Sequence, residues 1–181
     1  MRFVGLIVKE SGAQTLITLD EAKAQLRILD QFDDINIAAA TEAAVAYVEN
    51  FLWQSLRPQT VVASYEPDGS GYAELFRAAF DSLVGVEYFA PDGSKQTISN
   101  NDITVDDSLF VPRAYFAEPR TDSGKFGAVK ITYKTRAANT VSAQIKQAAL
   151  IALAQIYDNR DAPDFTAVDN ILTPLATRYQ L

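Results

Sequence analysis

The chain has 181 residues, of which 48% are hydrophobic, and this predicts one soluble domain with a buried core. Its formal net charge is −7 and no segment is rich in Lys and Arg, which argues against tight binding of nucleic acid. The absence of Cys and His excludes disulfides, thiolate zinc sites, cysteine nucleophiles and the commonest general base.

The sequence gives no sign of membrane insertion or export. No apolar run reaches the roughly 18 residues that span a bilayer. The N-terminal apolar stretch is too short for a signal peptide. We therefore expect no membrane association, and a cytoplasmic location at synthesis.

Residues 1–17 form an N-terminal arm in this interpretation. Phe3 to Val8 has strand propensity, and Ser11-Gly12 ends it. Two alternatives stay open, an edge strand of this chain's own sheet and an arm that docks on a neighbouring subunit.

Residues 18–56 predict the first helical part. Thr18 followed by Glu21 is a capping box that opens a helix over 18–28. An apolar stripe rich in Ala then predicts a second helix over 34–52.

Three acidic residues, Asp30, Asp33 and Asp34, separate these two helices. They lack the Gly and the Glu that a calcium loop carries at its sixth and twelfth positions. We therefore expect them to cap the second helix.

Residues 57–135 are typical of a β region. A tight turn at Pro91-Asp92-Gly93-Ser94 predicts a hairpin. A second, shorter hairpin is predicted from strands at 102–105 and 109–112. Residues 128–134 alternate with period two and predict a closing strand.

Residues 140–181 predict the C-terminal helices and a tail. Ser142 caps a strongly apolar helix over 142–159, whose stripe is widened by three residues: Leu150, Ile151 and Ala154. A helix that is apolar on more than one side needs more than one neighbour, so these three residues are the candidate subunit interface.

A last, weaker helix is predicted over 166–178, interrupted at Pro174. The chain then ends in a free tail or a docking arm: Arg178, Tyr179, Gln180 and Leu181.

The predicted fold class is α+β within a single domain over 1–181. An antiparallel helical core, with helices near 18–28, 34–52, 142–159 and 166–178, carries a β-hairpin-rich insertion between its second and third helices. No gap reads as a disordered linker.

The sequence contains no motif of a known catalytic or cofactor site. Phosphate loops, dinucleotide fingerprints, nucleophile elbows and HExxH are all missing. Adjacent acids such as Asp106 and Asp107 are typical of a solvated turn, because a catalytic carboxylate pair is held across a cleft. We expect no catalytic residue, metal or cofactor; a small-ligand-binding domain or an enzyme is the less favoured alternative.

Two groups of motifs resemble one known family. Residues 18–27, the helix end at 48–52 and the segment 56–60 are similar to the N-terminal half of phage head–tail connector proteins, also called adaptor or head-completion proteins. Residues 145–161 resemble that family's helix ending in an aromatic residue, an Asn and an Arg. The hairpin and the strand at 128–133 match members with a β insertion, so the resemblance covers the chain from Thr18 to Asp161.

The resemblance implies a structural virion protein of long-tailed phages, prophages or gene transfer agents. Its members form a ring, expected here to be a dodecamer, beneath the portal protein. The ring extends the DNA channel without specific DNA binding and meets a tail or stopper protein. The C-terminal tail becomes a candidate docking segment for portal or neighbour. A tail terminator or head-decoration protein is the rival within the assembly class, and assembly is expected in the cytoplasm of a bacterial host.

Overall fold

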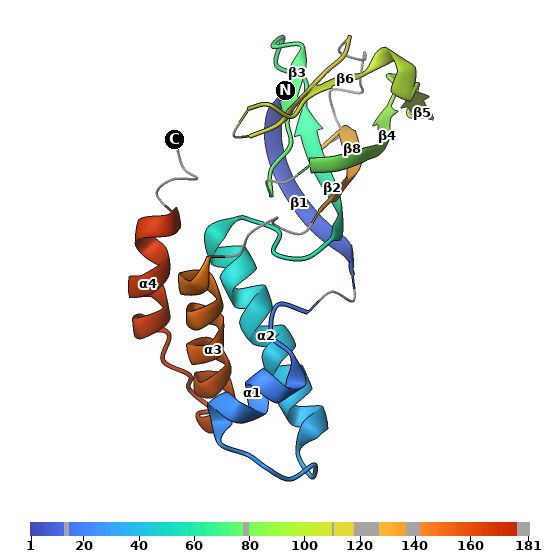
Figure 1. Cartoon of the computed structure of the whole chain (residues 1–181). Coiled ribbons are helices and arrows are strands. Elements are labelled where there is room, and N and C mark those ends of the chain that lie inside the picture. The colour runs from blue at the N-terminus through green and yellow to red at the C-terminus, as the bar shows by residue number, and fades with distance from the viewer. Residues whose placement is uncertain (13–14, 78–79, 110, 118–126, 137–141, 177–181) are drawn as a thin grey trace. The chain divides into compact units, whose positions relative to one another are not determined.

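The computed structural model describes residues 1–12, 15–77, 80–109, 111–117, 127–136 and 142–176. Within these residues the chain forms four α-helices and eight strands, so the predicted α+β class is confirmed. They divide into two compact units (Figure 1). The β unit contains the described residues of Met1–Ala13 and Arg57–Ala137, and the helical unit those of Gln14–Leu56 and Ala138–Leu181. The expectation of a single domain stays a prediction.

Helix α1 spans Leu19–Leu26 and begins with the predicted capping box. The Thr18 hydroxyl accepts from the Glu21 N–H at 3.3 Å, and the Glu21 carboxylate accepts from the Thr18 N–H at 3.0 Å. The helix ends earlier than the predicted residue 28, because Arg27 adopts a left-handed conformation with φ of 57°.

Helices α2 (Asp34–Leu52) and α3 (Ala143–Asp158) form the centre of the helical unit, as their apolar stripes predict. Ser142 caps α3, since its hydroxyl accepts from the Ile145 N–H at 3.3 Å. Small side chains are prominent in the buried core between the helices, which lets them approach closely: Ala40, Ala44, Ala148, Ala149 and Ala152.

Helix α4 (Thr166–Ala176) packs against α2 and α3. The predicted interruption at Pro174 is wrong, because the helix continues through this residue. Pro174 lies in the last turn of the helix and removes one N–H, which would otherwise donate to the carbonyl four residues earlier. Residues 177–181, including the predicted docking tail, lie outside the described residues.

The larger sheet of the β unit is antiparallel, with strand order β1-β2-β8-β4-β5. Its strands are β1 (Arg2–Ser11), β2 (Gln59–Glu66), β8 (Val129–Thr135), β4 (Phe80–Phe89) and β5 (Lys95–Ile98). Strand β8 buries Val129, Ile131 and Tyr133 on one face, which confirms the predicted alternation. Among the described strands, β1 pairs with β2 alone, so the edge-strand alternative for the N-terminal arm is confirmed. Docking of this arm on a neighbour stays a prediction.

The hairpin predicted at Pro91-Asp92-Gly93-Ser94 is present between β4 and β5. The Gly93 N–H donates to the Ala90 carbonyl at 2.8 Å, and Gly93 has φ of 82°. A glycine satisfies this left-handed position without steric cost.

A second sheet contains β3 (Tyr72–Glu74), β7 (Arg113–Tyr115) and β6 (Thr104–Asp106), in the order β3-β7-β6. The predicted second hairpin is therefore displaced: its return strand is 113–115 and not 109–112. Pro112 has no N–H for a ladder, and its carbonyl accepts from Leu75 at 2.7 Å, so the paired strand begins at Arg113. The short 3-10 helix η1 (Asn100–Asp102) also shortens the first strand.

Two buried tyrosines of the larger sheet bond to β3 and to the segment that follows it. The Tyr65 hydroxyl donates to the Glu74 carbonyl, and the Tyr133 hydroxyl donates to the Phe76 carbonyl at 2.6 Å. Burial raises the pKa of both phenols, which favours the neutral, donating form.

Candidate functional site

The loop between α1 and α2 exposes three large apolar side chains. Leu29 and Phe32 are each 98% exposed, and Ile35, in the first turn of α2, is 86% exposed. We call Leu29, Phe32 and Ile35 the apolar loop. Burying such a side chain is worth about 1.5–3 kcal/mol, so three exposed together in seven residues mark a surface for interaction.

This loop is fastened by hydrogen bonds within the helical unit. The Asp30 carboxylate accepts from the Phe32 N–H at 3.1 Å. The Lys23 ammonium donates to Asp34 at 2.8 Å and joins α1 to the start of α2. These contacts restrain the loop.

Asp33 occupies the N-cap position of α2 but does not cap it, contrary to the sequence-based expectation. Its carboxylate instead accepts from the Tyr157 hydroxyl and from the Asn36 amide. Arg160 lies 3.7 Å away and 5.5 Å from the Tyr157 ring centroid. The hydrogen bond from Tyr157, followed by that from Asn36, holds the pKa of Asp33 below its usual range.

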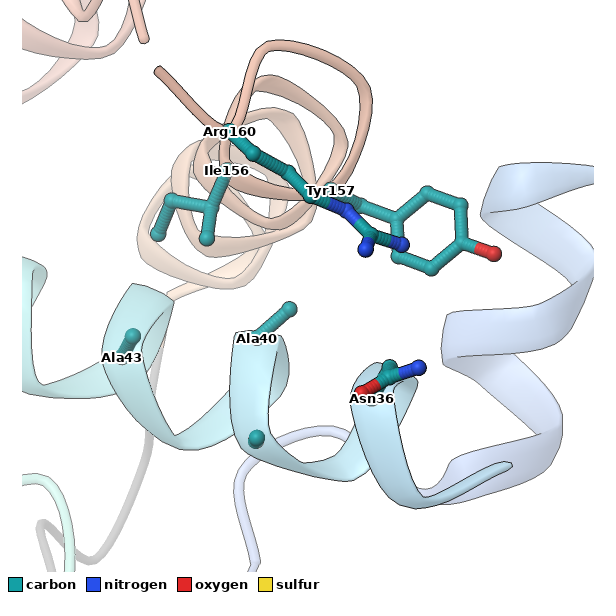
Figure 2. A pocket seen from close by; sticks show the side chains of 7 residues that line it. Asn36, Ala40, Ala43, Ile156, Tyr157 and Arg160 are labelled. Carbon is teal, nitrogen blue, oxygen red and sulfur yellow. The ribbon is translucent and has the colours of Figure 1, made fainter. Parts of the chain in front are cut away.

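A groove lies between α2 and the end of α3, close to this cluster (Figure 2). Its volume is about 310 Å³, and it is lined by Asn36, Ala39, Ala40, Ala43, Ile156, Tyr157 and Arg160. We call this the α2–α3 groove. Figure 2 shows Ile156 on α3 above the alanines of α2, and the Arg160 guanidinium beside the Tyr157 ring. The floor is apolar and the rim is polar, which suits an apolar side chain rather than a charged ligand.

The predicted interface residues lie on α3 and are all partly buried: Leu150, Ile151 and Ala154. Leu150 and Ile151 pack in part against the helical core. The structure does not bring these residues to the groove, and their role in an interface stays a prediction.

Acidic residues in the turns have a local structural role. Asp92, Asp106 and Asp164 each accept from the N–H and the hydroxyl of the residue two positions later. Hydrogen bonds from these hydroxyl groups, and then from the N–H groups, lower the pKa of each carboxyl. These carboxylates shape turns, as the sequence suggested for Asp106.

Among the described residues, no group of three or more acidic side chains is placed to hold a metal ion. None of the helices in the described residues is long and apolar enough to cross a membrane.

The sequence of residues 16–117 matches the model of the phage gp6-like head–tail connector protein family. The chain belongs to this family. The family resemblance expected from the motifs is thereby confirmed, and the chain is a structural connector at the head–tail junction of a virion. The sequence matches no curated protein.

Solved structures from gene transfer agent particles share the connector's fold. A chain from the virion of a native particle has a TM-score of 0.69 at 17% identity, covering 92% of this chain and 94% of that one. A chain from the neck of a native particle, computed with C12 symmetry, has a TM-score of 0.69 at 15% identity, covering 97% and 94%. The neck of an empty particle, computed with C6 symmetry, gives 0.67 at 14% identity, covering 94% of both chains.

Sequence reasoning missed the apolar loop and the groove of this connector. The signal for the loop is present in the sequence, because Phe32 lies between Asp30 and Asp33 and the acidic segment is flanked by Leu29 and Ile35. The groove had no comparable signal, since its two walls are more than 110 residues apart. The family resemblance indicates the motif at the end of α3, with Tyr157 and Arg160.

Proposed function

We propose that this connector forms a ring of identical subunits, a dodecamer, bound beneath the portal protein. The observation that supports this most directly is the likeness in fold, over nearly the whole chain, to a chain in a particle neck computed with C12 symmetry. A ring at that position extends the DNA channel and offers a platform to the tail or a stopper protein.

The charge of the connector suits a channel through which DNA passes. The net charge is −7, and no segment of the sequence is rich in basic residues. Affinity for DNA grows with the number of phosphates that Lys and Arg neutralise, so a wall without basic clusters does not retain the passing duplex. The proposed role is structural, without catalysis or a cofactor, and the site of action is the head–tail interface of the virion.

Two segments are proposed contacts in this assembly. Leu150, Ile151 and Ala154 of α3 are the candidate lateral interface, because they widen the apolar stripe of the helix. The tail from Arg178 to Leu181 is the candidate docking segment for the portal or a neighbouring subunit.

Electron microscopy of particles produced without this chain tests the function. We expect DNA-filled heads that lose their DNA and never join tails. Normal tailed particles would overturn the connector role. Restoring the full-length chain in trans controls for effects on neighbouring genes and should recover tailed particles.

A further inference from the structure

The helical unit carries an apolar projection and an apolar hollow. The projection is the apolar loop, in which Leu29 and Phe32 are each 98% exposed. The hollow is the α2–α3 groove. Phe32 is 98% exposed, so it does not occupy the groove of its own chain. Within one copy, the apolar loop and the α2–α3 groove are therefore both left without a contact between Phe32 and the groove.

The size of the groove fits an aromatic side chain. Its volume is about 310 Å³, whereas a cavity of about 150 Å³ already accommodates a benzene ring. Ala39, Ala43 and Ile156 offer methyl and methylene groups to such a ring. The fastened loop adds to this fit, because a preformed segment loses little conformational entropy on docking.

The charges beside the two surfaces are complementary. Asp30 lies between Leu29 and Phe32, and Arg160 stands at the rim of the groove with its side chain 64% exposed. A guanidinium has five N–H donors, so Arg160 can keep Asp33 and still bind a second carboxylate.

We propose that the apolar loop of one connector subunit docks in the α2–α3 groove of the next copy. Phe32 contacts Ala39, Ala43 and Ile156 of that copy, and Asp30 pairs with its Arg160. In this arrangement the loop and the groove of one copy engage two different neighbours, so the contact is heterologous and repeats from copy to copy until a rotation closes a ring. This contact rests on the proposed ring and names the side chains that build it.

Cysteine cross-linking tests the contact, because the sequence contains no Cys. The variant Gln31→Cys/Ala39→Cys, which keeps Phe32, is treated with a short bis-maleimide, both in particles and as the purified full-length chain. We expect a ladder of chain multiples on a denaturing gel, ending at the closed ring. Each single variant should stay largely monomeric on the gel.

The pair Gln31→Cys/Asn50→Cys is the matched control. Asn50 is exposed on the same helix and lies about 16 Å further along it, since a helix rises about 1.5 Å per residue. We expect at least tenfold less ladder from this pair. Equal ladders from both pairs would overturn the proposed register. Thermal unfolding of each variant confirms that the chain is folded.

The other outcomes separate this contact from the proposed function. A neck that contains the chain, without a ladder in particles or in solution, would overturn the docking and leave the connector role intact. Cross-links to a portal or tail protein in place of the ladder would assign the apolar loop to that partner and overturn the docking between copies. Normal tailed particles produced without the chain would overturn the proposed function. Cross-linking of the purified chain would still test the contact between copies in that case.

A charge exchange gives a second readout in the full-length chain. Asp30→Arg and Arg160→Asp alone should each lower the yield of the Gln31→Cys/Ala39→Cys ladder, by up to about fivefold for a pair worth at most about 1 kcal/mol. The two changes together should restore part of it, because they also remove the contacts of Asp30 with the Phe32 N–H and of Arg160 with Asp33 within one chain. Failure of the double change to recover any ladder contradicts the proposed pairing.

Discussion

The hydroxyl of Tyr157, in the last turn of α3, donates to the carboxylate of Asp33, immediately before α2. These residues are 124 positions apart in the sequence. Their bond fixes the end of α3 on the start of α2, where the α2–α3 groove and the apolar loop meet. Arg160 approaches the same carboxylate and completes a charged cluster at the rim of the groove.

Tyr157→Phe should lower the stability of the connector and change its dependence on pH. The hydrogen bond from Tyr157 lowers the pKa of Asp33 in the folded chain. The stability from this shift is full above the ordinary Asp pKa of about 3.9 and is lost as pH falls through the lowered value. Urea unfolding at several pH values should therefore show that the variant loses less stability on acidification than the unsubstituted chain. If stability depends on pH in the same way with and without Tyr157→Phe, the bond from Tyr157 to Asp33 contributes nothing. The same holds if Tyr157→Phe has an equal effect on stability in a chain that already carries Asp33→Asn.

Leu153→Ala should destabilise the helical unit by about 2–5 kcal/mol, because it leaves a cavity in a core where Leu153 has no exposed surface. Leu29→Ala removes the same atoms from a side chain that is 98% exposed, and should change the free energy of unfolding by less than about 0.5 kcal/mol. Denaturant unfolding of both variants measures the difference. Equal losses would contradict the exposure of the apolar loop.

Tyr47→Phe should cost about 1 kcal/mol of stability. The Tyr47 hydroxyl donates to Asp169 of α4 at 2.6 Å, and the ring stacks on Phe165 with centroids 4.1 Å apart. A hydrogen bond to a charged group contributes about 1.5–3 kcal/mol, and solvent reduces this at a partly exposed site. Burial and then Asp169 raise the pKa of Tyr47 to about 12, so its titration should move towards the ordinary value in Asp169→Asn. A titration that does not move would contradict this contact.

Asp68→Asn should make the stability of the β unit less dependent on pH in the acid range. The Met1 amino group lies 2.9 Å from Asp68, and its hydrogen bond, followed by those from Ser70, lowers the pKa of Asp68 to about 2. This ion pair stabilises the folded state above about pH 4 and is lost as pH falls towards 2. Asp107→Asn removes the same charge from an exposed position in the same unit and is the control. Identical acid profiles for the two variants would argue against a stabilising ion pair.

Charging the candidate lateral interface should impair assembly more than folding. Ile151→Asp also costs stability, because part of Ile151 packs against the helical core. Ala154→Asp is the sharper change, since a methyl group at a half-buried position contributes little to the core. We expect folded Ala154→Asp chains, seen by circular dichroism, that are missing from particle necks. If Ala154→Asp chains enter particle necks at the normal level, Ala154 is not part of the interface.

Local signals in the sequence predicted most of the elements. The capping box at Thr18, the cap at Ser142, the alternation of β8 and the turn before Ser94 each act within a few residues, so the printed sequence already contains the partners that form them. The same local reasoning failed at Pro174, because packing of α4 against its neighbours outweighs a proline in the last turn.

The sequence by itself determined the α+β class, the helical stripes, the first hairpin and, through its motifs, the connector family. Only the tertiary structure decided that Asp33 binds Tyr157 in place of capping α2, that the second hairpin returns at Arg113, and that the apolar loop lies exposed near a groove. The reason is the range of the interactions. A cap or a turn is closed by neighbours in the chain, whereas a carboxylate or a groove takes its partners from helices that folding brings together across more than 110 residues.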